Sequence, residues 1–378
     1  METPQTRRAD IDWLRIIAVF LLFPFHTAML FFSKEDFYIK LAPSHSAFDY
    51  FVLFLSPWHM PFLFFLAGIS THYSLIKRSI PEYIIERTQR LLVPFLFGIV
   101  IIVPPQSYLA YMFRNEDKNF SEFFHYYWTN LFSDLTGYNG TFTPAHLWFV
   151  LYLYVYSIFS AKIFSYIAKA EQKISPSPTL PTITPYIIIF LYPILICILD
   201  QLPTISTKNP FYYYAYFLIG FIIPSIPKFE SIVRKNLTIL LCVGLLTATL
   251  YLRLINHTFQ KYSFEDILFY ILRRYNGWVW LLIVFSTSQY LEKFINSILI
   301  YLSEASYPIY ILHQTVIIAV GYTLYKYTAL PSITFFFICL IASILITLFI
   351  YHKFIREFRI FRYLFGMKSR TLTEVKNT

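Results

Sequence analysis

The sequence predicts an all-α integral membrane protein of about ten transmembrane helices, with both termini in the cytoplasm. Hydrophobic residues make up 57% of the 378 residues. Charged residues make up only 14%, whereas a soluble globular protein carries about 25%. Apolar runs that approach the roughly 20 residues needed for a helix to cross a bilayer recur along the chain. These observations favour a multi-pass protein of the inner or plasma membrane.

Ten segments have the composition expected of transmembrane helices. They are residues 13–33, 50–75, 91–113, 147–168, 183–200, 211–227, 237–255, 277–291, 307–325 and 332–352. The eighth is short and follows the amphipathic stretch Phe264–Tyr275, which either extends that span or lies at the membrane interface, so the count is about nine to eleven. We expect a transmembrane domain over residues 1–352 and a basic cytoplasmic tail over residues 353–378 that binds anionic lipid headgroups.

The distribution of lysine and arginine sets the predicted orientation. With a cytoplasmic N-terminus, about two-thirds of the 31 Lys and Arg residues fall in cytoplasmic segments, as the positive-inside rule requires. The exception is the outer segment 253–274, with Arg253, Lys261, Arg273 and Arg274. The net charge of +10 is thereby explained without a nucleic-acid partner. Three cysteines in three separate apolar runs indicate neither a metal site nor a disulfide.

Two ionisable residues in the first span form the most informative pattern. Arg15 and His26 are eleven residues apart, so on a helix they lie on nearly the same face, about 16 Å apart along the axis. On a purely structural interpretation, Arg15 extends to the lipid headgroups and His26 is a core histidine held by a hydrogen bond. However, ionisable groups within a span are costly and by default indicate function. A neutral imidazole is a natural general base, and we interpret His26 in this way.

Two further arginines precede the third span. Arg87 and Arg90 are separated by three positions and share a helix face at the predicted cytoplasmic end. Together with Arg15 they would form a mouth of three guanidinium groups, which suit phosphates. Alternatively, these arginines only follow the positive-inside rule and anchor the ends of their helices at the cytoplasmic surface.

Several other residues are candidates for supporting roles. His59 lies in the second span between Pro57 and Pro61, at a depth similar to that of His26, so that the two rings could line one cavity. Asp49 is the carboxylate most available to orient a histidine. His146 and Trp148 open the fourth span, where an aromatic belt would also explain the tryptophan. His313 lies a few residues into the ninth span; its role is left open, as is that of His59 and His146.

Taken in order, these motifs resemble the acyltransferase-3 family of membrane proteins, and most closely its periplasmic-glucan succinyltransferase-like branch. The matching elements are Arg15 with His26, Met60 to Gly68, Arg87 with Arg90 and Pro94, His146-Leu-Trp-Phe, and Ser306-Tyr-Pro-Ile-Tyr-Ile-Leu-His313-Gln. The resemblance implies about ten helices and transfer of an acyl group, usually acetyl or succinyl, from cytosolic acyl-CoA to an extracytoplasmic acceptor, usually a sugar hydroxyl. It assigns the family's functional residues to His26, Arg15, Arg87 and Arg90. No metal is expected, because the sequence has no metal-type spacing.

The leading hypothesis is therefore a membrane O-acyltransferase, an enzyme that transfers groups other than amino-acyl groups. The three arginines would hold the phosphates of acyl-CoA, and His26 would either deprotonate the acceptor hydroxyl or carry the acyl group itself. His59, His146 and His313 would orient the base, bind the acceptor or stabilise the oxyanion. The alternatives are a saccharide transporter or exporter that uses the same polar cavity, and a sensor or scaffold. Expected partners are the bilayer, acyl-CoA and a glycan.

Overall fold

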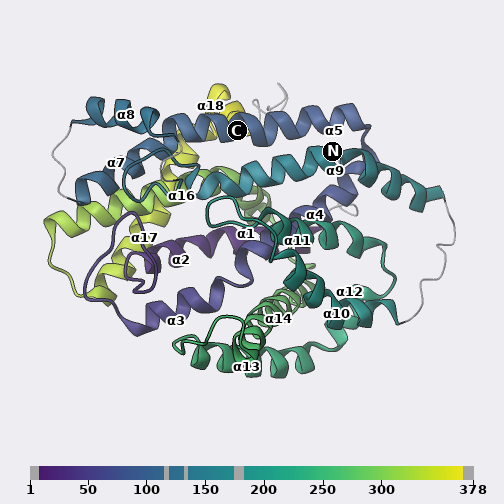
Figure 1. Ribbon diagram of the computed structural model, residues 1–378. Coiled ribbons are helices and arrows are strands. Elements are labelled where there is room, and N and C mark those ends of the chain that lie inside the picture. Colours follow the sequence, from purple (N-terminus) through teal and green to yellow (C-terminus); the bar gives the residue numbers. More distant parts are fainter. Residues whose placement is uncertain (1–7, 115–118, 132–134, 174–182, 369–378) are drawn as a thin grey trace. The chain divides into compact units, whose positions relative to one another are not determined.

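The computed structural model confirms the predicted fold class (Figure 1). It describes residues 8–114, 119–131, 135–173 and 183–368. Within these ranges the chain folds almost entirely into helices, and no β-strand is formed. In the described part of the chain, eight helices are long and apolar enough to cross a membrane. They are Ala9–Met29, Ser46–Lys77, Ile80–Phe113, Ala145–Ala170, Leu237–Leu254, Phe264–Leu291, Ser297–Tyr327 and Ser332–Ile355.

Two of the ten predicted spans differ from these eight helices. The segment 183–200 forms α10 (Thr184–Leu199), which is apolar but shorter than the others. The segment 211–227 forms α11 (Pro210–Ile222) and η5 (Ile223–Ser225), and the chain then bends by 101° before α12 (Phe229–Lys235). Pro224 and Pro227 lie at this bend, where proline cannot continue a helix. Counting the bent pair as one span gives nine.

The amphipathic stretch before the eighth predicted span belongs to the same helix as that span. Helix α14 runs from Phe264 to Ser286 without a break, and α15 (Ser288–Leu291) follows directly. The side chain of Ser263 caps its N-terminus by accepting a hydrogen bond from the backbone N–H of Asp266 at 3.1 Å. The stretch therefore extends the span.

The third span is interrupted by π-helical turns that adjoin its prolines. Helix α5 (Ile80–Arg87) passes into η2 (Thr88–Leu92), then α6 (Val93–Phe97), η3 (Gly98–Ile102) and α7 (Val103–Phe113). Pro94 and Pro104 have no N–H to donate to the carbonyl four residues earlier. The backbone N–H groups of Val93 and Val103, each just before a proline, donate five residues back. Arg87 directly precedes η2 and Arg90 lies within it, so the wider turn alters their predicted i, i+3 relation.

The chain is divided into two compact units, each built from several separate stretches of sequence. The first contains residues 1–18, 53–84 and 156–300, and the second contains residues 19–52, 85–155 and 301–378. The remaining helices of the first unit are α4 (His59–Lys77) and α13 (Leu237–Leu254). Those of the second are α2 (Leu22–Met29), α8 (Phe120–Thr129), η4 (Ala145–Leu147), α17 (Ser332–Ile350), η6 (Tyr351–Ile355) and α18 (Arg359–Leu364). Helices α1 (Ala9–Phe20), α3 (Ser46–Leu55), α9 (Trp148–Lys173) and α16 (Ser297–Tyr327), like α5, have residues in both.

In the first unit, α4 and α11 cross at two glycines. A Cβ atom on Gly68 would lie 2.2 Å from the carbonyl oxygen of Phe217, and one on Gly220 would lie 2.1 Å from that of Phe65. The two backbones therefore approach as closely as small residues allow in membrane helix pairs.

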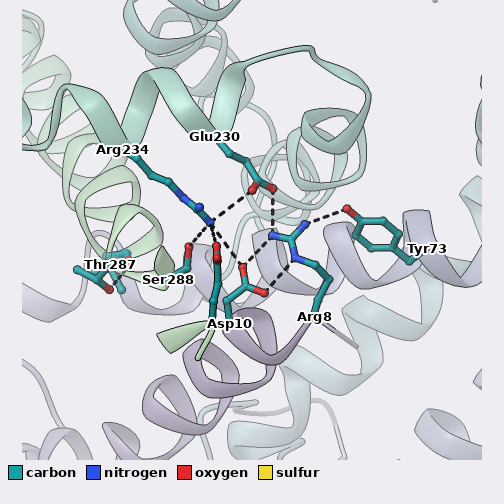
Figure 2. A network of polar contacts seen from close by, with 9 residues as sticks. Arg8, Asp10, Tyr73, Glu230, Arg234, Thr287 and Ser288 are labelled. Atoms are coloured by element: carbon teal, nitrogen blue, oxygen red, sulfur yellow. Dashed lines mark hydrogen bonds and ion pairs between the residues drawn. The ribbon is translucent and has the colours of Figure 1, made fainter. Parts of the chain in front are cut away.

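A network of ion pairs ties the start of α1 to α12 and α15 in the first unit (Figure 2). The Asp10 carboxylate is 2% exposed and lies 2.8 Å from the guanidinium of Arg8 and 3.9 Å from that of Arg234. Glu230 accepts from Arg8 at 3.0 Å, and Arg234 pairs with Glu292 at 2.5 Å. The lysine and arginine distribution predicts that the N-terminus, residues 228–235 and the segment around Lys293 are cytoplasmic. The ion pairs that join these three segments support their location on the same side of the membrane.

One of the four basic residues in segment 253–274, assigned to the outer side, has a structural explanation. Arg274 forms an ion pair with Asp200, and its guanidinium lies 4.6 Å from the centre of the Tyr212 ring. Asp200 also accepts a hydrogen bond from the Tyr270 hydroxyl at 2.7 Å. The charge is therefore balanced within the unit.

In the second unit, the segment after α2 is fixed by its own polar contacts. Burial raises the pKa of Tyr38 well above its ordinary value, so the phenol stays protonated and donates to the carbonyl of Thr136 at 3.1 Å. Residues beyond 352 pack onto the same unit, because Arg362 on α18 donates to Glu304 at 2.7 Å. The described part of the predicted tail, up to Lys368, is thus held against α16.

Candidate functional site

His26 lies near the end of the first span, on α2. Pro24 cannot donate a hydrogen bond back to Phe20, and the helix is interrupted at Leu21, where α1 gives way to α2. The His26 ring stacks on Phe37 with a centroid separation of 5.9 Å and an interplanar angle of 14°. The side chain is partly exposed. It is thus held by aromatic contacts and still accessible from outside the protein.

Two other histidines form a cluster with His26 within the second unit, in which His313 contacts both of the others. The ring centroids of His26 and His313 are 5.2 Å apart, and those of His313 and His146 are 4.9 Å apart. His313 is completely buried on α16 and His146 is 6% exposed in η4. We call His26, His146 and His313 the histidine cluster. Of its members, only His26 has substantial accessible surface.

The short turn before His146 is strained. Ala145 has a φ of +48°, a left-handed conformation that is uncommon for residues other than glycine. The backbone N–H of Ala145 donates to Thr143 Oγ1 at 2.8 Å, and this hydroxyl donates to the carbonyl of Leu135 at 2.7 Å. Backbone strain of this kind persists where surrounding contacts hold it, and it concentrates at functional sites.

Backbone carbonyls fix the tautomers of the two buried rings. His146 Nε2 lies 2.9 Å from the carbonyl oxygen of Ile311, and His313 Nδ1 lies 2.6 Å from that of Tyr310. Because a carbonyl only accepts, both nitrogens must carry hydrogen. In the neutral rings, His146 Nδ1 and His313 Nε2 are then acceptors. The Tyr310 hydroxyl donates to the carbonyl of His146 and holds η4 on α16.

The remaining sequence candidates lie outside this cluster. His59 belongs to the first unit, and its buried Nε2 donates to the carbonyl of Ala18 at 2.7 Å. Both carboxylate oxygens of Asp49 accept from Ser33, one from its N–H at 2.8 Å and the other from its hydroxyl at 2.6 Å. Trp148 opens α9 and contacts Tyr152 edge-on at 5.4 Å. The structure therefore brings together three of the predicted histidines and places the fourth elsewhere.

Two of the three predicted arginines, Arg15 and Arg90, are partly exposed and pair with carboxylates. Arg15, in the first unit, pairs with Asp12 at 3.2 Å and donates to the Ser70 hydroxyl at 2.9 Å. Arg90, in the second, pairs with Glu86 at 3.1 Å. The side chains of Arg15 and Arg90 are 36% and 43% exposed. Ion pairs at this exposure contribute roughly 0–1 kcal/mol, so an incoming phosphate can compete with the carboxylates.

The structure places the His313 ring next to that of His26. Sequence reasoning names His59, His146 and His313 as candidates to support His26 but does not predict which of them contacts it. It also missed Tyr310. The only sequence signal for Tyr310 was its position three residues before His313, which puts both on one face of a helix. No group of three or more metal-ligating side chains suited to a metal ion occurs within the described ranges.

Comparison with known proteins assigns the chain to one family. The acyltransferase-3 family model, described as an acyltransferase domain, matches residues 8–352. The chain is 21% identical over 340 residues to glucans biosynthesis protein C of Salmonella typhimurium and of Salmonella typhi, covering 84% of each chain. No solved structure matches the chain. Because the family model covers nearly the whole chain, this protein belongs to the acyltransferase-3 family and is a membrane acyltransferase that transfers groups other than amino-acyl groups.

Proposed function

We propose that this protein transfers an acetyl or succinyl group from cytosolic acyl-CoA to a hydroxyl group of an extracytoplasmic glycan. Membership of the acyltransferase-3 family supports acyl transfer. The relatives named glucans biosynthesis protein C support a glucan as the acceptor, because the chain covers 84% of their length. The proposed location is the inner or plasma membrane, with both termini cytoplasmic.

The observation that carries this proposal is the accessibility of His26 beside two buried histidines. An enzyme that uses a sugar hydroxyl as nucleophile needs a base that the hydroxyl can reach. His26 is the partly exposed member of the histidine cluster, whereas His313 and His146 are buried. In the proposed reaction His26 takes the hydroxyl proton while the hydroxyl oxygen bonds to the thioester carbonyl carbon. The carbon–sulfur bond then breaks, and the CoA sulfur leaves with the proton from His26.

A second route uses the same residue as the nucleophile. A ring nitrogen of His26 would attack the thioester, form an acyl-imidazole, release the CoA thiol and then pass the acyl group to the hydroxyl. Both routes need His26 and differ in whether a covalent intermediate forms. Incubation with labelled acyl-CoA in the absence of the acceptor, followed by denaturation at neutral pH, distinguishes them, because only the second route leaves label on the protein.

The proposal assigns the donor phosphates to arginine side chains. Arg87 and Arg90 lie in the second unit, at the turn where α5 passes into η2. A guanidinium group binds phosphate oxygens with two parallel hydrogen bonds. Arg15 is assigned the same ligand, and substitution of each arginine tests whether it contributes.

The experiment that tests the proposed function compares cellular glycans. Cells that lack the gene are complemented with the wild-type protein, with His26→Ala or with the control His257→Ala, which changes an exposed histidine. We expect acylated glucan by mass spectrometry with the wild type and the control, and unmodified glucan outside the cell with His26→Ala. Glucan retained inside the cell would instead support the transporter. Full acylation with a well-expressed His26→Ala variant would refute the assignment of His26.

A further inference from the structure

The two ring nitrogens of His313 differ, because one donates a hydrogen bond to the backbone and the other is an acceptor without a donor among the described residues. Its side chain is completely buried, and Nδ1 donates to the Tyr310 carbonyl at 2.6 Å. The neutral ring therefore presents Nε2 as a hydrogen-bond acceptor. Within the described ranges this buried nitrogen has no hydrogen-bond partner. A buried acceptor without a donor is uncommon in native proteins and calls for a specific explanation.

The aromatic rings that surround His313 can be examined in turn for a donor. Phe23 has none, and the Tyr310 hydroxyl is already engaged with the His146 carbonyl. His146 uses its Nε2–H for the Ile311 carbonyl, so its other nitrogen is an acceptor as well. His26 remains, with its ring centroid 5.2 Å away and its plane tilted by 39°. Among these rings it is the one that can present an N–H group to His313.

We propose that His313 is a positioning residue for His26. It accepts a hydrogen bond from one ring nitrogen of His26 and thereby leaves the other nitrogen, without hydrogen, directed toward the acceptor hydroxyl. Catalytic hydrogen bonds are often long or poorly aligned before substrate binds, and a rotation of the partly exposed His26 ring closes this one. The inference rests on the proposed function, in which His26 is the reacting histidine.

This arrangement follows from the chemistry of the base. Neutral imidazole carries its single hydrogen on either nitrogen, and only the nitrogen without hydrogen accepts a proton. A fixed acceptor behind the ring selects one tautomer, as the orienting group does in other histidine-dependent sites. When His26 takes the hydroxyl proton, its N–H toward His313 stays in place. No proton moves to His313 in this step.

The test combines three substitutions in the full-length protein in nanodiscs. His313→Leu removes the acceptor, and His313→Gln restores an amide oxygen. We expect His313→Leu to lower kcat about 10- to 100-fold with KM for acyl-CoA unchanged, because the interaction matters only when His26 reacts. His313→Gln should recover part of this loss. The double variant His26→Ala with His313→Leu should be no slower than His26→Ala alone, since His313 acts through His26.

A spectroscopic measurement tests the contact without relying on activity. In ¹⁵N-histidine NMR spectra of the wild type, neutral His26 should show one tautomer, and in His313→Leu a mixture. The matched control is His72→Leu, which removes another buried histidine that belongs to the first unit and should change neither readout.

Several results would overturn the inference. The first is a wild-type kcat in His313→Leu, and the second is an unchanged tautomer of His26 in that variant. The third is a loss of kcat in the double variant equal to the product of the losses in the two single variants. Retained activity in His26→Ala with none in His313→Leu would make His313 the base and also refute the inference. Absence of acyl transfer by the wild type would refute the proposed function instead, and the NMR result would still decide whether His313 orients His26.

Discussion

In the first unit the buried carboxylate of Asp10 has two cationic partners, whereas in the second unit the buried rings of His146 and His313 each keep an acceptor nitrogen without a partner among the described residues. The first arrangement satisfies its charges and ties three segments together. The second uses hydrogen bonds to backbone carbonyls to hold the two rings in place, and the His313 ring lies next to the partly exposed His26. Under the proposed function, the difference separates polar groups that stabilise the fold from polar groups arranged for chemistry.

The largest expected effect is on the rate when His26 is replaced. His26→Ala should lower kcat for acyl transfer about 1,000-fold, within the range measured for general bases and equivalent to about 4 kcal/mol of barrier. The unfolding temperature in detergent should stay close to that of the wild type, because the ring is only partly buried. A large loss of stability with an unchanged kcat would show that His26 stabilises the fold, and the contrast with the Asp10 network would then be wrong.

Asp10→Ala should have the opposite effect to His26→Ala, with lower stability and an unchanged kcat. Removal of the buried carboxylate leaves Arg8 and Arg234 without this partner and should lower the free energy of unfolding by about 2–4 kcal/mol. This estimate is lower than for a fully buried ion pair, because the side chains of Arg8 and Arg234 are 31% and 22% exposed. Thermal unfolding measured by tryptophan fluorescence provides the check, and the protein that remains folded should keep its kcat. A stable but inactive variant would contradict the structural role.

Substitution of an arginine in the second unit should affect donor binding. Arg90→Ala should raise KM for acyl-CoA about tenfold, equivalent to roughly 1.4 kcal/mol, and leave kcat nearly unchanged, because the guanidinium binds ground state and transition state alike. Steady-state kinetics across acyl-CoA concentrations measure both constants. The control is Lys235→Ala, an exposed basic residue on α12. An equal rise in KM in this control would point to nonspecific electrostatic attraction.

The smallest effect is expected at the exposed edge of the Asp10 network. Glu292→Gln removes a charge that is 47% exposed and pairs with Arg234. Because exposed ion pairs contribute little, the free energy of unfolding should fall by less than about 1 kcal/mol. A loss as large as that of Asp10→Ala would show that the network acts as one unit and would require a different division between its buried and exposed members.

The sequence was sufficient to predict the fold class. Long apolar runs with few charges predict membrane helices, because the bilayer imposes a fixed length. The boundary of α14 was left open, since periodicity alone does not tell an interfacial stretch from the start of a span. The bend after α11 and the short α10 depend on prolines and on packing, and a hydropathy pattern does not report either.

The composition of the histidine cluster was beyond the reach of sequence spacing. Depth along the helix suggested His59 as the neighbour of His26, but depth does not specify which helices pack together. The contact with His313 joins residues 287 positions apart. It depends on the packing of α2 against α16, and the tautomer of His313 depends on the Tyr310 carbonyl. These features become visible only when the side chains are placed.

The most direct test of the central claim is transfer of label by the purified protein. Wild type and His26→Ala would be reconstituted in liposomes that hold glucan inside, and acyl-CoA with a radioactive acyl group would be added outside. Molecules whose cytoplasmic face points outward should move label to the enclosed glucan in the wild type, while His26→Ala should leave it unlabelled. Equal labelling by both proteins would contradict the assignment of the chemistry to His26.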